Sequence, residues 1–242
     1  YTPRALSGLG NALNRYNRTT FEPAYITGMR IDMLPVTLGC GIIEWKVYGY
    51  TDAVDRAELL RLNNYATSLD PSRFVGGLAP IADALAYASS VLQDKNATED
   101  DVSRAVQKLL TDLRLLKPIN NNMAFAAVVT ASYTSSWERL SAVNDGKTSY
   151  HWGTWGRTSS EEWVQYEWPQ GAKIGSTNLK VWNDGSGIKT PTKIVYSYIP
   201  YDSETDEWVV AATITQGIVA TNNYDTCDNP YDFGKLPMIK AM

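Results

Sequence analysis

The chain has few histidines and cysteines, and its net charge is not positive. Its 242 residues contain one histidine, His151, and two cysteines, Cys40 and Cys227, too few for a Cys/His metal centre or a disulfide framework. The two cysteines are either two inert buried thiols or one long-range bridge. The formal net charge of −4 argues against electrostatic capture of nucleic acid or of an anionic membrane. No apolar run reaches the roughly 18 residues of a membrane span.

Paired catalytic carboxylates are also missing from the pattern. Glu161 and Glu162 are adjacent in a strand-like stretch and therefore point to opposite faces, whereas a glycosidase needs two carboxylates facing one bond. A Ser-His-Asp or Cys-His arrangement would rest on His151 alone. We therefore expect this chain to be no enzyme by itself, but an accessory part of one.

Tryptophan and tyrosine are abundant, with 8 Trp and 15 Tyr against 4 Phe. Both side chains combine a flat apolar face with a polar tip, which suits a sandwich core and also the C–H face of a sugar. Residues 150–157, "YHWGTWGR", place several of them in one glycine-loosened loop. Consecutive aromatics cannot all face a core from one loop, so we expect one or two to be exposed.

This loop is the best candidate for a carbohydrate site. We expect its aromatic rings to stack on a sugar and its arginine guanidinium to donate to sugar hydroxyls, with Trp137 as a neighbour. Trp152 and Trp182 have an alternative role as core residues. The candidate carbohydrate-binding residues are Tyr150, His151, Trp155, Arg157 and Trp182.

Residues 53–117 have helical periodicity. Asp70-Pro71 predicts an N-cap followed by proline at the first helical position, and Thr98 predicts the cap of a third helix with acidic residues in its first turn. Short loops join three apolar stripes, which favours an antiparallel three-helix bundle. The stripes are Leu59, Leu62, Ala66 and Leu69; Phe74, Leu78, Ile81, Leu85, Ala88 and Leu92; and Val102, Val106, Leu109, Leu113 and Leu116.

Residues 20–50 and 123–242 have strand-like alternation instead. The second region contains "EEWVQYEWP", "TNLKVWNDGSG" running into a turn, and two strands around an acidic turn in "TKIVYSYIPYDSETDEWVVAATI". Many short strands separated by Gly, Asn and Asp predict an antiparallel sandwich or jelly roll. The fold class expected is therefore α+β multidomain, with a β-sandwich and a three-helix bundle.

Two family resemblances add to this interpretation. Residues 55–117, with "NATEDDV" at the start of the last helix, resemble the FIVAR module, a small helical bundle in large secreted bacterial proteins. Residues 123–242, with "TASYTSSWERLSAVNDGKTS" and "EEWVQYEWPQGAKIGSTNLKVW", resemble a galactose-binding-like, discoidin-type sandwich. Such sandwiches serve as carbohydrate-binding modules of glycoside hydrolases, and the variant here is most like those attached to arabinofuranosidase-type enzymes.

The discoidin resemblance also implies a structural calcium ion. Its ligands would come from an Asp-Gly turn, a nearby hydroxyl and a glutamate before the last strand, which correspond to Asp145, Thr148 and Glu44. Calcium takes six to eight oxygen ligands, many from backbone carbonyls, so few side chains are needed. An Asp-Gly turn without metal is the alternative.

The family's closing strands occur in the wrong place for a single module. They match residues 16–49, "YNRTTFEPAYITGMRIDMLPVTLGCGIIEWKVYG", whereas the C-terminal part stops at "DFGKLPMIKAM". We expect residues 1–50 to complete the sandwich of residues 123–242, within one chain or in a strand-swapped dimer. A cut across two tandem modules is the other interpretation.

Together these features predict a non-catalytic carbohydrate-binding region of a secreted bacterial polysaccharide-degrading enzyme. The expected location is extracellular or at the cell surface, and the chain is expected to belong to a longer protein. The alternative is a structural spacer or protein-interaction region of a multidomain hydrolase or adhesin, with no sugar site.

Overall fold

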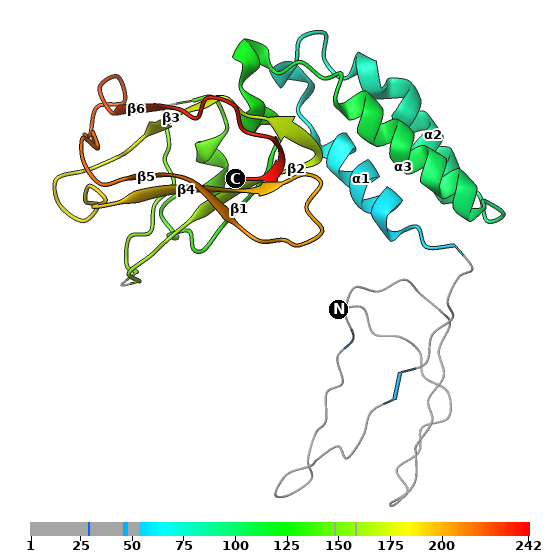
Figure 1. Cartoon of the computed structure of the whole chain (residues 1–242), viewed down its shortest axis with the longest axis horizontal. Helices are drawn as coiled ribbons and strands as arrows, with labels where there is room; N and C mark the ends of the chain where they lie inside the picture. The colour runs from blue at the N-terminus through cyan, green and yellow to red at the C-terminus, as the bar shows by residue number, and fades with distance from the viewer. Residues whose placement is uncertain (1–28, 30–45, 48–53, 148, 158) are drawn as a thin grey trace, which may run out of the picture. The chain divides into compact units, whose positions relative to one another are not determined.

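The computed structural model describes residue 29 and residues 46–47, 54–147, 149–157 and 159–242. The chain divides into two compact units, residues 1–53 and 54–242. The second unit is α+β, with three α-helices, a five-stranded antiparallel sheet and a two-stranded sheet (Figure 1). Most of the strands expected in residues 20–50 lie outside the described residues. Of that stretch the structure describes Met29, Lys46 and Val47, and these three are in no strand.

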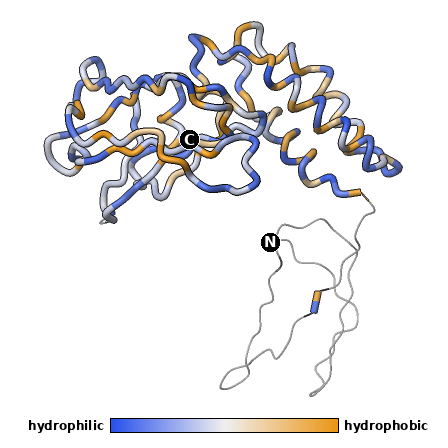
Figure 2. Tube along the Cα trace, in the orientation of Figure 1, coloured by the Kyte–Doolittle hydropathy of each residue, from blue (hydrophilic) through white to orange (hydrophobic). Residues whose placement is uncertain are grey.

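The first and third helices match the sequence prediction. Helix α1 is Ala57–Ser68 and helix α3 is Glu99–Leu113. The Thr98 hydroxyl accepts from Asp101 N, and the Asp101 carboxylate accepts from Thr98 N, which completes a capping box. These bonds from Thr98 lower the pKa of Asp101 to about 2. Figure 2 shows apolar and polar residues alternating along the helices, and every residue of the first and third stripes is buried.

The second helix differs from the prediction, because it begins eleven residues later than Asp70-Pro71 indicated. Asp70 does cap a helix, with its carboxylate accepting from Ser72 N at 2.9 Å, but this is the single 3-10 turn Pro71–Arg73. Gly76 and Gly77 follow with φ of 78° and 65°. These left-handed values interrupt a right-handed helix. Helix α2 therefore is Ala82–Gln93, preceded by the 3-10 turn Ala79–Ile81.

The five-stranded sheet has the order β1-β2-β7-β4-β5, and a separate pair joins β3 to β6. "DFGKLPMIKAM", where the sequence analysis expects the sandwich to stop, supplies β7, and β7 is the middle strand. The Gly171 residue in β2 has φ of 77°, at the irregularity where β2 meets β7. The strands are β1 Val128–Ala131, β2 Val164–Lys173, β3 Ser176–Lys180, β4 Ile194–Pro200, β5 Val209–Ile214, β6 Asp228–Asp232 and β7 Met238–Ala241.

The helices and the sheet share one hydrophobic core, in which Trp168 of β2 is buried together with the helical stripes. The Tyr65 hydroxyl of α1 donates to the Ala126 carbonyl at 2.6 Å, and burial raises the pKa of Tyr65 to about 12. Arg114, after α3, donates from Nε to the Gln170 carbonyl of β2 at 2.8 Å. These contacts fix the helices to the sheet as parts of one unit.

Candidate functional site

Three loops bring His151, Trp182 and Tyr224 into one aromatic stack. The ring centroids of His151 and Trp182 are 5.2 Å apart with planes at 21°, and those of Trp182 and Tyr224 are 5.0 Å apart at 23°. The Tyr224 hydroxyl lies 3.4 Å from His151 Nδ1. If the two rings lay on opposite faces of the indole, their planes would be about 7 Å apart, which is twice a stacking distance of about 3.5 Å. Their polar atoms could then not approach to 3.4 Å. The imidazole and the phenol therefore lie on the same face of Trp182, and neither covers the other face.

Tyr224 has a hydroxyl that stays protonated, because burial raises its pKa. It serves the stack as a hydrogen-bonding group and not as a charged one. The next turn holds Cys227, a buried free thiol whose Sγ is 3.6 Å from the Tyr224 carbonyl oxygen. Cys40, the other half of the predicted alternative bridge, lies outside the described residues.

A buried carboxylate, that of Glu138, contacts the His151 ring of the stack. Glu138 Oε1 is 3.4 Å from His151 Nε2, and the Glu138 side chain is only 7% exposed. Its Oε2 is buried and has no hydrogen-bond partner among the described residues. A Cβ on Gly153 would lie 2.8 Å from both carboxylate oxygens, so a glycine is required at this position. Glu138 thus fixes the imidazole from the side opposite to Tyr224.

Trp155 belongs to the segment between β1 and β2, and its side chain packs on a turn of the β3–β4 loop. Its Nε1 is 2.6 Å from where a Cβ of Gly187 would lie, and the indole is 53% exposed. The Asp184 carboxylate closes this turn by accepting from Ser186 N at 2.8 Å and from Ile188 N at 3.0 Å. The same backbone bonds lower the pKa of Asp184, with that from Ser186 the largest. Trp155 is therefore half exposed on a rigid support.

Arg157 contacts other partners than the stack. Its Nε is 3.1 Å from Glu162 Oε1, and its guanidinium carbon is 4.9 Å from the centroid of the Tyr133 ring. Glu162 also accepts from the Ser132 hydroxyl, and this bond, more than the one from Arg157, lowers the pKa of Glu162. Because the Arg157 side chain is still 44% exposed, it keeps donors available to solvent.

Tyr150 and Trp152 are held by the framework of the loop. The Arg139 guanidinium lies 4.0 Å from the centroid of the Tyr150 ring, which is 49% exposed. Trp152 Nε1 donates to the Tyr133 carbonyl at 2.9 Å and lies 3.1 Å from Thr134 Oγ1. Trp152 thus has the packing role that the sequence analysis gave as its alternative.

The structure brings together part of the predicted site. His151 and Trp182 are in direct contact, and Trp155 lies on the loop that follows Trp182, whereas Arg157 and Tyr150 contact separate partners. Sequence reasoning missed Glu138 and Tyr224. Tyr224 lies between polar neighbours in "NNYDT", and an aromatic in such a turn is a sign that it packs against something; Glu138 gave no sign.

The predicted calcium ligands are mostly outside the described part of the chain. Asp145 Oδ1 accepts from Lys147 N at 2.7 Å, which is the bond expected of an Asp-Gly turn. Thr148 and Glu44 are not among the described residues. Within the residues that the structure describes, no group of three or more His, Cys, Asp or Glu side chains could hold a metal ion. Calcium therefore stays a prediction.

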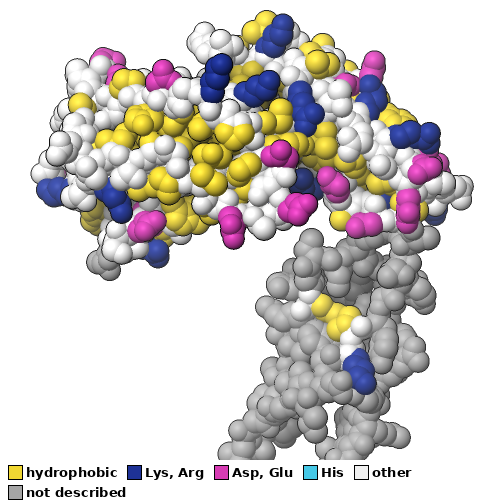
Figure 3. Space-filling view, viewed as in Figure 1, with side chains coloured by type: hydrophobic (Ala, Val, Ile, Leu, Met, Phe, Trp, Pro, Cys, Tyr) yellow, Lys and Arg dark blue, Asp and Glu magenta, His cyan; other side chains and the backbone are white. Residues whose placement is uncertain are grey.

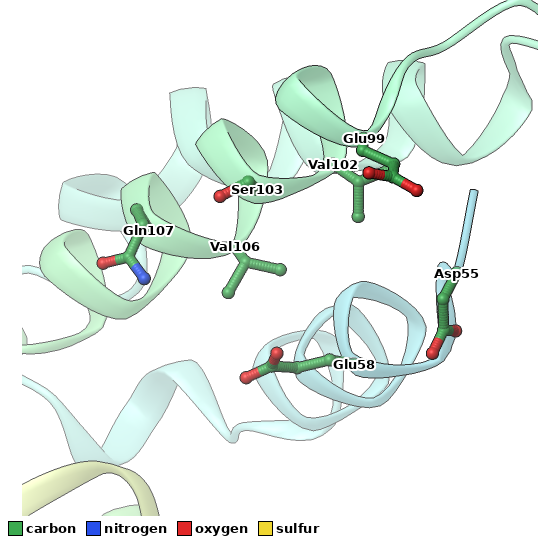
Figure 4. A pocket seen from close by; sticks show the side chains of 7 residues that line it. All are labelled: Asp55, Glu58, Glu99, Val102, Ser103, Val106 and Gln107. Carbon is green, nitrogen blue, oxygen red and sulfur yellow. The ribbon is translucent and has the colours of Figure 1, made fainter. Parts of the chain in front are cut away.

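Two hollows in the second unit lie apart from the aromatic loops. One, of about 330 Å³, is open between α1 and α3 and has three carboxylates on its wall (Figure 4). The other, of about 270 Å³, lies where α1 and the following turn meet β1. The first is lined by Asp55, Glu58, Glu99, Val102, Ser103, Val106 and Gln107, and the second includes Tyr65, Arg73, Phe125 and Asn144.

No helix in the described ranges has both the length and the apolar character needed to cross a membrane. Comparison of the chain with protein-family models, with curated proteins and with solved structures gives no match in any of the three.

Proposed function

We propose that this chain is the non-catalytic carbohydrate-binding region of a secreted bacterial polysaccharide-degrading enzyme. The observation that carries the proposal is the half-exposed Trp155, fixed on the Asp184–Ile188 turn beside the stack of His151, Trp182 and Tyr224. A sugar offers an apolar C–H face and several hydroxyls. An exposed indole matches the face, and nearby polar groups match the hydroxyls.

Each site residue has a distinct role in this proposal. Trp155 stacks on the sugar, and Trp182 offers the indole face that His151 and Tyr224 leave uncovered. Arg157 donates to sugar oxygens from the exposed part of its guanidinium, while Glu162 orients it. Tyr150, half exposed beside Arg139, borders the site. A single site of this kind binds weakly, and it is useful because tethering raises the local concentration of substrate near a catalytic domain.

The finer fold assignment belongs to the same proposal. The two antiparallel sheets are consistent with a galactose-binding-like jelly roll, and the three helices with their buried stripes are consistent with a FIVAR-like bundle. We propose that residues 1–50 supply the closing strands of the jelly roll, in cis or in trans. We also propose that Asp145, Thr148 and Glu44 bind a structural calcium ion. An extracellular or cell-surface location follows from the enzyme class proposed.

The test is a glycan array followed by calorimetric titration with plant arabinans, galactans and host glycans. Wild type should bind at least one of them, and Trp155→Ala should abolish or strongly weaken that binding. Trp208→Ala is the matched control, because Trp208 is 46% exposed but follows β4, whereas the site loop precedes β4. Absence of binding to every glycan by the wild type would sink the proposal.

A second candidate function is a structural or protein-interaction role without a sugar site. It is favoured by valines that stand exposed on the sheet: Val195 of β4, and Val209 and Val210 of the edge strand β5, are 43%, 41% and 61% exposed. Figure 3 shows hydrophobic side chains gathered over the sheet on the face drawn. Exposed apolar surface on a sheet often marks an interface. Sedimentation that reports a dimer, together with no glycan binding, would favour this candidate.

A further inference from the structure

Trp137 is the most exposed large hydrophobic side chain in the described part of the chain, at 80%. It is at the tip of a tight turn, in which Glu138 N donates to the Ser135 carbonyl at 3.1 Å. Trp137 N donates to Ser135 Oγ at 3.3 Å, and Ser135 itself is only 2% exposed. The closed turn thus presents a whole indole ring to solvent, where its flat apolar face is available to a ligand.

The turn is anchored to the aromatic loop on both sides of Trp137. Before it, Ser135 N donates to the Gly153 carbonyl at 3.0 Å, and after it, Arg139 N donates to the His151 carbonyl at 3.2 Å. The neighbouring Glu138 is buried against His151. The backbone that carries the indole is therefore fixed before any ligand arrives, which limits the entropy lost on binding.

Trp137 and Trp155 belong to the same pair of segments but to different points along it. The backbone bonds pair Ser135 with Gly153 and Arg139 with His151, which sets Trp137 opposite Trp152, and Trp155 is three residues further along the second segment. Three residues span at most about 10 Å of extended backbone. Two exposed indoles on neighbouring, hydrogen-bonded segments match successive sugars of a chain better than one terminal sugar.

We infer that Trp137 is a second stacking platform, and that the ligand of this site is an oligosaccharide chain lying along Trp155 and Trp137. The inference rests on the proposed carbohydrate-binding function and names its ligand class. It gives Trp155 the inner sugar and Trp137 a sugar further along, so Trp137 contributes to affinity only when the chain is long enough to reach it.

The experiment is calorimetric titration with two series of probes, α-1,5-linked arabino-oligosaccharides and β-1,4-linked galacto-oligosaccharides of one to six sugars. The expected result is an affinity that rises with length in wild type and reaches a plateau. Trp137→Ala should weaken binding of the longest probe by at least about fivefold, a usual effect for an aromatic contact, and leave the shortest bound probe within about twofold. Trp137→Phe should restore most of the affinity.

Controls separate this inference from the function on which it rests. Trp155→Ala should weaken binding of every length, and Trp208→Ala of none. Circular dichroism and thermal melting should be unchanged in Trp137→Ala, because this side chain is 80% exposed. An equal loss at all lengths, or no loss at any, would overturn the role of Trp137 and leave the carbohydrate proposal standing. If wild type binds neither series nor any array glycan, the function and the inference both fail.

Discussion

Gly153→Ala is the substitution that best tests the geometry under the aromatic stack. A Cβ at Gly153 would lie 2.8 Å from both carboxylate oxygens of Glu138 and 2.9 Å from its Cδ. Ordinary non-bonded contact is about 3.5 Å, so the carboxylate has to move by roughly 0.7 Å or more. The Glu138–His151 contact is already 3.4 Å long, and this movement breaks it. We expect unfolding free energy to fall by about 1–3 kcal/mol, as in other overpacked sites.

A double-mutant cycle with Glu138→Ala isolates this cause. Removing the carboxylate removes the atoms that the new methyl group meets, so Gly153→Ala should cost little in the Glu138→Ala background. Glu138→Ala alone should also lower the unfolding free energy, by about 1–2 kcal/mol, because it removes the Oε1 contact with His151 and leaves a cavity, although the buried Oε2 has no partner to lose. We expect a coupling of about 1–2 kcal/mol between the two positions.

Urea unfolding of the four proteins measures the coupling, and a thermal melt checks it. For a domain of this size, each kcal/mol shifts the melting temperature by about 2–4 °C. Single-mutant effects that add to within about 0.5 kcal/mol would show that the methyl group and the carboxylate do not meet. In that case the position of the Glu138 carboxylate against Gly153, as described above, is wrong.

Three further substitutions test the frame around the site. Gly171→Ala should cost more than about 2 kcal/mol in a thermal melt, because the residue has φ of 77° and its Cβ would lie 2.7 Å from the Tyr201 ring. Thr98→Ala should cost about 1 kcal/mol in urea unfolding near neutral pH. That cost should shrink as pH falls from about 4 towards 2, because the pKa of Asp101 is about 2 when folded and near 3.9 when unfolded, so the pairing stabilises only the ionised form. Tyr65→Phe should cost about 1 kcal/mol at pH 7 and should reduce the loss of stability between pH 10 and 12, since the folded Tyr65 pKa is about 12 and lies above its unfolded value.

The helical part was predictable where its determinants are local. Thr98 and Asp101 form their capping box within one turn, so the start of α3 could be inferred from four residues. The segment from Asp70 to Ile81 could not, because its apolar spacing matches a helix while its two glycines take left-handed values. Phe74 is buried as the stripe predicted, yet it pairs with Pro118 in an isolated bridge. In this stripe periodicity identified residues that are buried or partly buried, the latter being Leu78, Leu85 and Leu92, but not the backbone conformation that places them.

The candidate site was predictable only in the part that one loop contains. His151 and Trp155 are four residues apart, and their aromatic density is visible in the sequence. The contact between Tyr224 and His151 joins residues 73 positions apart, and it depends on how the β5–β6 loop approaches the other two. Glu138 is related to His151 by backbone pairing in a segment with no strand pattern. Such contacts are set by tertiary packing, which local patterns do not encode.

On the proposed function, the junction between helices and sheet bears on how a bound glycan would be oriented. Arg114 donates to the Gln170 carbonyl and also lies 5.2 Å from the centroid of the Tyr201 ring, while Arg73 donates to the Asn144 carbonyl at 2.9 Å. These bonds join the helical part to the sheet part at separate points, so they oppose rotation of one part relative to the other. A flexible tether would raise only the local concentration of a bound chain. On the proposed function, a fixed junction also sets the direction in which that chain leaves the aromatic loops relative to the helices.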